Sequence, residues 1–241
     1  VTIVLSIGVT NMSKKNAIIR KLTAVETLGC AQIICSDKTG TLTQNKMTVV
    51  DAFCSDEDFF STGMALCTDA EVDGQEVKGE PTEAALVAYA LSRNLNKNDL
   101  KVKYPRVAEV PFDSGRKMMT TVHEYEGAYI QFTKGGPDVI LSRCTTAIID
   151  GKEIPMTEEV RSQIMAQNKA MADKALRVLA LSMKKLSAVP SEQTSEALEN
   201  DLVFVGLSGM IDPVRPEVKD AIAQCRSAGI TPIMITGDHK D

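Results

Sequence analysis

Residues 31–41 read Ala-Gln-Ile-Ile-Cys-Ser-Asp-Lys-Thr-Gly-Thr, an apolar run that turns polar at Asp37. A run of this length that ends in a polar, glycine-containing segment is typical of a buried strand followed by a loop. A similar stretch, Thr-Pro-Ile-Met-Ile at 231–235, precedes the segment 236–238. Because ligands of open α/β sheets bind beyond the carboxyl ends of strands, we expect these two polar segments to share one ligand-binding edge.

The residues before the apolar run at 231–235 predict a βαβ unit. Apolar residues recur at helical spacing over 217–228, and Gly229 follows where a helix C-cap is expected. A third apolar run, at 202–207, precedes that helix. Strand, helix and strand in this order predict a parallel sheet.

The middle of the chain has a different pattern, with alternating strands and amphipathic helices of an α+β domain. We expect an α/β domain interrupted by this insert of roughly 150 residues, which is an ordinary domain size. The insert is predicted to contain helices over 81–93 and 158–176, strands over 107–111, 119–133 and 177–183 with a turn at 126–127, and a polar loop or short helix over 184–200.

The composition of the 241 residues is that of a globular protein, with 44% hydrophobic and 24% charged residues. The formal net charge is −5, aromatic residues make up 4%, and tryptophan is absent. Nucleic-acid-binding proteins normally show a basic surface and often aromatic stacking platforms. The sequence therefore argues against a nucleic-acid partner.

The six cysteines lack the spacing of a zinc site, since no C-x-x-C pair occurs and no histidine lies near them. Cys35 and Cys225 stand in apolar surroundings and are predicted to be small buried hydrophobic residues. Free cysteines in an ordinary globular chain indicate a reducing, cytosolic compartment. The two histidines, His123 and His239, have no partners in the sequence and are expected to be solvated.

Residues 1–9 are nearly all apolar but too short to cross a bilayer, and no signal-peptide pattern is present. A start within an apolar run suggests a piece of a longer protein, with a buried first strand or helix as the alternative. The basic pair Lys14-Lys15 suits either the cytosolic edge of a membrane helix or a solvated helix end.

An aspartate at the end of a strand can carry chemistry. Its carboxylate can attack a phosphoryl group and form an acyl phosphate. Gly40 allows close approach of the backbone, while threonine hydroxyls and loop N–H groups can hold phosphate oxygens. A lone aspartate after a strand more often stabilises a turn, so the interpretation depends on the whole motif.

The whole motif, Cys-Ser-Asp-Lys-Thr-Gly-Thr-Leu-Thr at 35–43, resembles the phosphorylation motif of P-type ATPases. These are ion pumps that pass through an aspartyl phosphate. Residues 14–30 look like the stalk below the fourth membrane helix of type II pumps, and the calcium-transporting class is the most similar. The resemblance covers essentially the whole chain, since further family motifs follow in order at 78–83 (KGEPTE), 111–113 (PFD), 134–137 (KGGP), 212–215 (DPVR) and 236–238 (TGD).

The resemblance implies a haloacid-dehalogenase-like, Rossmannoid parallel sheet interrupted by an α+β nucleotide-binding domain with an antiparallel sheet. Residues 1–20 would be the end of the fourth membrane helix and the stalk. Residues 21–50 and 202–241 would be the two parts of a truncated phosphorylation domain, and 51–201 the nucleotide-binding domain.

The resemblance also implies residue roles. Asp37 would be the phosphorylated nucleophile, in the motif with Lys38 and Thr39, and Asp37 and Thr39 would hold Mg²⁺. Phe112 would stack on the adenine of ATP. Further contacts with the nucleotide or its phosphates would come from Glu83, Lys117, Met119, Lys134, Gly135, Arg177, Asp212, Arg215, Thr236, Gly237 and Asp238.

Four of these residues have plainer alternatives. Phe112 could be a core residue, Lys134 a turn residue before Gly-Gly-Pro, Arg177 a surface charge and Asp212 a helix cap.

The position two residues after Asp37 distinguishes a pump from a phosphatase. Related aspartyl phosphatases carry a second aspartate there as general acid/base, whereas this chain has Thr39. Without that acid the acyl phosphate should hydrolyse slowly. A pump needs such a long-lived intermediate, because the ion must move before the acyl phosphate is hydrolysed. ATP would also need Mg²⁺ and lysine groups to neutralise its phosphates.

The family's GDGxNDxPAL, TGE and membrane segments are missing from the sequence. We therefore expect a soluble fragment from the cytoplasmic face of an integral membrane pump, without sustained turnover by itself. Its partners would be ATP, the actuator and membrane domains of the parent, and a transported cation, with calcium favoured over a sodium/potassium-type pump. The alternatives are a nucleotide-binding module without catalysis and a soluble phosphatase; Thr39 and the large insert argue against the phosphatase.

Overall fold

The computed structural model describes residues 2–21, 23–74 and 76–236. The chain divides into two compact units. The first unit comprises Val1–Asn45 and Val214–Asp241, and the second unit comprises Lys46–Pro213.

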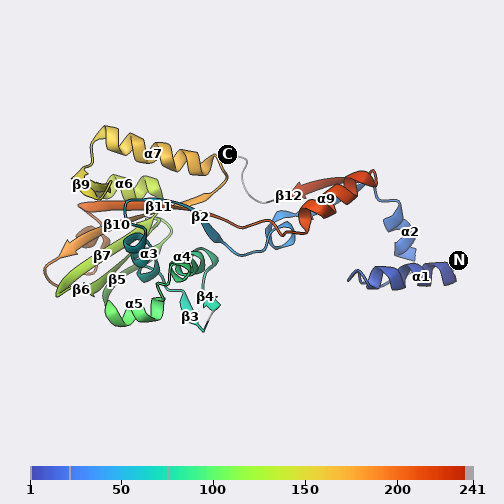
Figure 1. Cartoon of the computed structure of the whole chain (residues 1–241), viewed down its shortest axis with the longest axis horizontal. Helices are drawn as coiled ribbons and strands as arrows, with labels where there is room; N and C mark the ends of the chain where they lie inside the picture. Colours follow the sequence, from blue (N-terminus) through green and yellow to red (C-terminus); the bar gives the residue numbers. More distant parts are fainter. Residues whose placement is uncertain (1, 22, 75, 237–241) are drawn as a thin grey trace. The chain divides into compact units, whose positions relative to one another are not determined.

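The second unit is built on one large, mainly antiparallel sheet of eight strands (Figure 1). Along the sheet the order is β5-β6-β7-β10-β11-β8-β9, and β2 pairs antiparallel with the second half of β11, from Gly206 to Ile211. A short β8–β11 pairing is parallel, and β3 and β4 form a separate hairpin. The strands of this unit are β2 (Thr48–Cys54), β3 (Glu71–Asp73), β4 (Glu76–Lys78), β5 (Arg106–Asp113), β6 (Met118–Tyr125), β7 (Ala128–Gly135), β8 (Cys144–Ile149), β9 (Lys152–Pro155), β10 (Arg177–Leu186) and β11 (Leu202–Ile211).

Helices cover both faces of this sheet. In β10, Leu181 belongs to one apolar cluster and the adjacent Ala180 to another, as expected where successive side chains point to opposite faces. The first cluster includes residues of α3, α4 and α5, and the second includes residues of α6 and α7. The helices are α3 (Glu57–Leu66), α4 (Pro81–Ser92), α5 (Lys97–Lys103), α6 (Pro137–Arg143), α7 (Glu158–Ala172) and α8 (Ser195–Leu198).

The predicted elements of the insert are confirmed. Helices α4 and α7, the hairpin β6–β7 with its turn at Glu126-Gly127, and strand β10 all form where the patterns indicate. Both helices begin at clear signals. Pro81 is at the start of α4 and Thr157 caps α7 by accepting a hydrogen bond from the amide of Val160.

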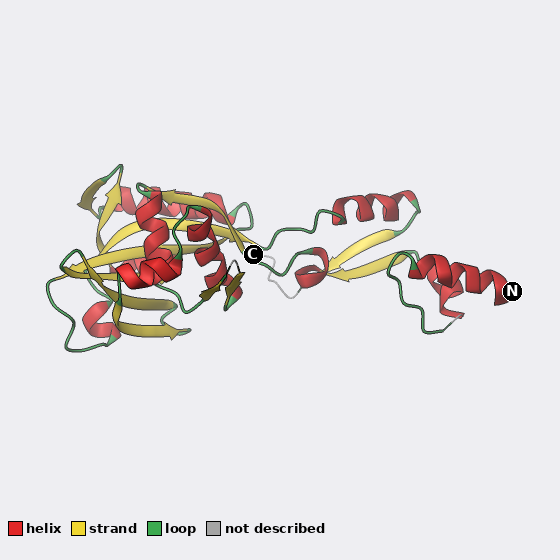
Figure 2. Cartoon of the chain, turned by 60° about the horizontal axis from the view of Figure 1, so that its bottom comes forward, coloured by secondary structure: helices red, strands yellow, loops and turns green. Residues whose placement is uncertain are grey.

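The first unit contains a two-stranded parallel sheet and short helices (Figure 2). Strand β1 (Ile33–Asp37) pairs with β12 (Thr231–Ile235), so that Asp37 lies opposite Ile235. Helix α9 (Val218–Ser227) precedes β12, and α1 (Thr2–Ser13) and α2 (Thr23–Gly29) precede β1. Gly229 follows α9 with φ +74°, a left-handed conformation that suits a helix C-cap.

The predicted βαβ unit is wrong in its first strand. The apolar run 202–207 forms part of β11, which pairs with β2 and β10 in the sheet of the second unit. A continuous apolar run fits any strand buried on both faces, and in β11 the helices of the second unit provide that burial. The parallel partner of β12 is β1 instead. The inserted domain was expected to span residues 51–201. Because β2 and β11 both belong to the large sheet, the second unit extends beyond that range at both ends.

The predicted burial of β1 is also wrong. Ile33 is 58% exposed, and Cys35 is exposed rather than buried. Cys225 is partly buried on α9. Two strands and one helix present too little apolar surface to cover both faces of a sheet. Within the described residues, no helix is both long enough and apolar enough to cross a membrane.

His123 was expected to be solvated but is 1% exposed. It lies on β6, which pairs with β5 and β7 and is buried from Met118 to His123. Its Nδ1 lies 3.0 Å from the carbonyl oxygen of Tyr104, and its Nε2 lies 2.9 Å from Oγ1 of Thr121. His239 lies outside the described residues.

Candidate functional site

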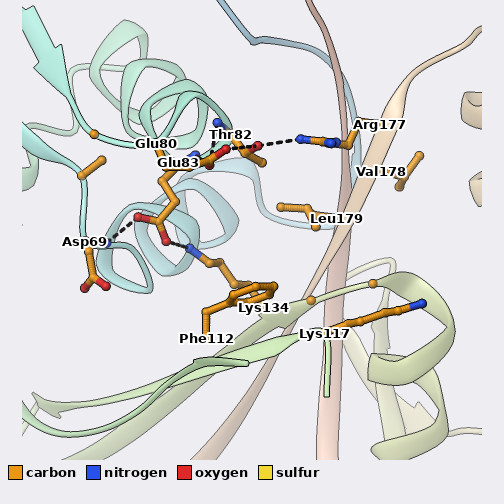
Figure 3. A pocket seen from close by; sticks show the side chains of 14 residues that line it. Asp69, Glu80, Thr82, Glu83, Phe112, Lys117, Lys134, Arg177, Val178 and Leu179 are labelled. Atoms are coloured by element: carbon orange, nitrogen blue, oxygen red, sulfur yellow. Dashed lines mark hydrogen bonds and ion pairs between the residues drawn. The ribbon is translucent and has the colours of Figure 1, made fainter. Parts of the chain in front are cut away.

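A pocket of about 770 Å³ opens in the second unit (Figure 3). It lies where the start of α4, the ends of β5 and β7 and the start of β10 meet. Fourteen residues line it: Asp69, Ala70, Gly79, Glu80, Thr82, Glu83, Phe112, Lys117, Lys134, Gly135, Gly136, Arg177, Val178 and Leu179.

The first turn of α4 contributes three of these side chains. The Glu80 carboxylate caps the helix by accepting hydrogen bonds from the amides of Thr82 and Glu83, at 2.9 and 3.2 Å. This cap fixes the first turn, so that Glu83 points into the pocket (Figure 3).

A buried ion pair stands at the back of the pocket. Lys134 at the end of β7 is 6% exposed, and its Nζ pairs with Oε1 of Glu83. The other carboxylate oxygen of Glu83 accepts a hydrogen bond of 2.8 Å from the amide of Asp69. Charge-assisted hydrogen bonds of this kind hold both side chains in place, so the pocket presents a positioned cation.

The segment that carries Asp69 is held by a second buried lysine. Nζ of Lys97 donates to the carbonyl and hydroxyl oxygens of Thr68 and to the carbonyl oxygen of Ala70, at 2.5–2.9 Å. Burial without a carboxylate partner lowers the pKa of Lys97 to about 8. Lys97 thereby fixes the backbone from which Asp69 reaches Glu83.

The opposite wall carries an exposed aromatic ring. Phe112 lies near the end of β5 and is 61% exposed, which is unusual for so large an apolar side chain. The turn after it brings Lys117, in the left-handed region with φ +55°, against Gly135. A Cβ atom at Gly135 would lie 2.5 Å from the carbonyl oxygen of Lys117, so this close approach requires glycine.

Arg177 closes the rim at the start of β10, where its Nη1 donates to Oγ1 of Thr82 at 2.9 Å. Of the seven residues of the insert predicted to contact a nucleotide, six therefore line one pocket, although they come from five separate segments.

Met119 is the one of these seven that does not line the pocket. It is 1% exposed and packs in the first apolar cluster, because alternation along β6 turns its side chain into the core.

Sequence reasoning missed the lining residues Asp69, Gly79, Glu80 and Thr82. Three of them stand in the motif at 78–83, in which the resemblance assigns a role only to Glu83. Reading every position of that motif would have found them, whereas Asp69 carries no signal in the sequence.

The motif at 35–43 lies in the first unit, at the carboxyl end of β1. Asp37 is exposed there, and Thr236 follows directly after Ile235, the register partner of Asp37. Both parallel strands therefore end at one edge, as predicted. The loop after Asp37 is held by Arg215, whose Nη2 donates to the carbonyl oxygen of Gly40 at 3.1 Å. Within the same loop, the carbonyl oxygen of Lys38 accepts a hydrogen bond from the hydroxyl of Thr43.

Asp212 lies in the second unit, where its Oδ1 accepts a hydrogen bond of 3.1 Å from the amide of Lys46. Gly237 and Asp238 lie outside the described residues.

The sequence profile of the P-type ATPase cytoplasmic domain N matches residues 58–217, about two thirds of the chain. The chain belongs to the P-type ATPase family. It is 48% identical over its whole length to calcium-transporting ATPase 1 of Lactococcus lactis, 47% to calcium-transporting ATPase 1 of Bacillus cereus and 46% to calcium-transporting ATPase lmo0841 of Listeria monocytogenes. It covers 29%, 28% and 29% of the length of these relatives.

Within the described part of this P-type ATPase chain, few residues could hold a metal ion. No cluster of three or more histidine, cysteine, aspartate or glutamate side chains occurs within the part of the chain that the structure describes. Magnesium ions are often bound by one or two protein oxygens, with water and substrate phosphates completing the shell. The carboxylate of Asp37 is exposed and offers an oxygen of this kind.

Proposed function

We propose that the chain is the ATP-binding and phosphorylation region of an ATP-driven cation pump that works through an aspartyl phosphate at Asp37. The second unit would be its nucleotide-binding domain and the first unit part of its phosphorylation domain. The observation that carries the proposal is the meeting, around one pocket, of six residues predicted to contact a nucleotide, with the motif at 35–43 at a strand end in the other unit.

The pocket suits an adenine nucleotide. The exposed ring of Phe112 offers a flat apolar surface on which a purine can stack. Lys117 and Arg177 place positive charges in the lining of the pocket, and the ammonium group of Lys134, paired with Glu83, offers a positioned hydrogen-bond donor. ATP carries several negative charges, so these cations favour its binding.

Asp37 suits the transfer step. Its carboxylate oxygen would attack the γ-phosphorus of ATP, and the bond to ADP would break as the acyl phosphate forms. When bound, Mg²⁺ on Asp37 and Thr39 supplies charge neutralisation at the transferred group. Because Thr39 cannot act as a general acid or base, the acyl phosphate would persist long enough for ion movement.

The parallel pair β1–β12, with Asp37 at its carboxyl end, supports a haloacid-dehalogenase-like sheet. Calcium is the proposed ion because the three relatives named above are called calcium-transporting ATPases. In the parent protein this region would face the cytoplasm and work with an actuator domain and a membrane domain.

Titration with ATP tests the pocket. Binding by calorimetry should fall at least tenfold, about 1.4 kcal/mol, in Phe112→Ala, because the stacking surface is lost. Val102→Ala is the matched control, since Val102 is 83% exposed on α5 and does not line the pocket. Equal affinities of Phe112→Ala and the unchanged chain would refute the assignment of the pocket.

Labelling of the full-length protein tests the nucleophile and the ion. Incubation with γ-labelled ATP should give a hydroxylamine-sensitive label that requires calcium and is absent in Asp37→Asn. A label that survives in Asp37→Asn would refute the nucleophile. A label that requires sodium or another cation instead would refute calcium.

A further inference from the structure

The strand that carries Phe112 contains a bulge. The register of β5 against β6 runs from Val110 opposite Thr120 to Asp113 opposite Met118, so β5 uses one residue more than β6 over this stretch. The extra residue falls at Pro111–Phe112. Bulges disrupt the regular pairing and redirect a side chain, and here the ring of Phe112 lines the pocket instead of the core.

Arg116 holds this bulge. Its Nη2 donates to the carbonyl oxygen of Pro111 at 2.6 Å, one residue before Phe112. Its amide donates to Oδ1 of Asp113 at 2.8 Å, one residue after. One residue therefore binds the backbone on one side of Phe112 and a side chain on the other.

Arg116 is fixed in turn by Glu199. Nη1 of Arg116 pairs with Oε1 of Glu199, whose side chain is 1% exposed. The same oxygen accepts a hydrogen bond of 3.1 Å from the hydroxyl of Thr120 on β6. The loop that carries Glu199 is held to the sheet at the next residue, because Nζ of Lys184 donates to the carbonyl oxygen of Asn200 at 2.9 Å.

Burying a carboxylate costs considerable desolvation free energy, which a nearby opposite charge and hydrogen bonds offset. Within the described residues, Oε2 of Glu199 has no hydrogen-bond partner, so Arg116 supplies the compensating charge for this group. The fork of the guanidinium reaches Glu199 and Pro111 at once, which an ammonium group at one point does not reproduce.

We propose that Arg116, held by Glu199, is a positioning residue for the nucleotide base: it fixes the bulge at Pro111–Phe112 so that the ring of Phe112 is presented to the purine. This inference rests on the proposed function of the pocket. It assigns Arg116 no contact with the phosphates, which distinguishes it from Lys117 next to it.

The test compares adenosine with ATP on the full chain, by ligand-observed NMR and by calorimetry. Arg116→Ala should weaken both ligands by the same factor, roughly tenfold or about 1.4 kcal/mol. Arg116→Lys keeps a charge beside Glu199 and should keep the melting temperature, yet lose adenosine binding as Arg116→Ala does. Glu199→Gln should weaken adenosine to a smaller extent.

Three results would overturn the inference. Loss of ATP affinity without loss of adenosine affinity would make Arg116 a phosphate ligand. Full adenosine binding by Arg116→Lys would show that only a positive charge is needed at this position, not the fork of the guanidinium. Unchanged binding of both ligands in Arg116→Ala and Arg116→Lys would show that the ion pair with Glu199 has only a structural role. If Phe112→Ala binds adenosine as the unchanged chain does, the proposed pocket fails instead, which separates the two hypotheses.

Discussion

At the scale of single residues, His123 makes the stability of the second unit depend on pH. Burial lowers its pKa to about 4, with Arg106 and Lys97 adding to the shift and the hydrogen bond to Tyr104 opposing it. In the unfolded chain the imidazole of His123 binds a proton near pH 6.5, whereas in the folded chain it does so only near pH 4. The free energy of unfolding should therefore fall as pH falls from 7 to 4.5, by about 2 kcal/mol.

His123→Gln is the variant that isolates this effect. Urea unfolding at pH 7, 6, 5 and 4.5 should show a much flatter dependence in the variant than in the unchanged chain. The carboxyl groups of Glu71, Glu159 and Glu196, whose pKa values hydrogen bonds lower in the folded chain, are present in both proteins and contribute equally to both curves. Parallel curves for the two proteins would contradict the assignment to His123.

No pattern in the sequence indicates that His123 is buried. Its partners are the carbonyl oxygen of Tyr104 and the hydroxyl of Thr121, and only the pairing of β6 with β5 and β7 brings its strand into the interior. Met119 illustrates the same limit. A motif assigns it to the pocket, but strand alternation decides which face it occupies.

At the scale of elements, the cap of α4 connects stability with binding. Glu80→Ala removes the acceptor of two amides at the helix start, which should cost about 1 kcal/mol. It also releases the first turn that positions Glu83 and, through it, Lys134. We therefore expect a several-fold weaker affinity for ATP in addition to a lower melting temperature.

Asp56→Ala is the matched control for this cap. Asp56 caps α3 by accepting hydrogen bonds from the amides of Asp58 and Phe59, at 3.0 and 2.9 Å, and it does not line the pocket. Its removal should lower the melting temperature to a similar extent and leave the affinity for ATP unchanged. If both variants lose affinity equally, the effect of Glu80 is one of general stability.

Elements of the second unit were predictable where periodicity and end signals agree. Pro81 marks the start of α4, and Glu126-Gly127 marks the turn between two strands. Strand β11 was assigned to the wrong sheet because an apolar run does not reveal its partners. Similarly, periodicity alone could not show that Glu83, Phe112 and Lys134 share a pocket; the family motifs supplied that expectation.

At the scale of the whole molecule, the apolar core is distributed unevenly. Within the described residues, the buried apolar side chains all belong to the second unit, from Phe60 to Met210. In the first unit Ile33, Ile233 and Met234 are exposed on the two-stranded sheet. Since apolar burial is the main source of folding free energy, the second unit should be much more stable than the first.

The chain enters and leaves the second unit at neighbouring points. Thr48 at the start of β2 pairs with Ile211 at the end of β11, and the amide of Lys46 donates to Asp212. Residues 46–213 can therefore be separated from the rest of the chain without breaking a sheet. We expect this piece to fold by itself and to bind ATP with the affinity of the full chain.

Hydrogen exchange on the full chain measures the same difference directly. Amides of β6, β7 and β10 should exchange only on global unfolding of the second unit, whereas those of β1 and β12 should exchange through local opening. Equal protection in β1 and β7 would show that the first unit derives its stability from more than its own contacts. An unfolded 46–213 piece would show that the large sheet depends on the first unit, in spite of its complete core.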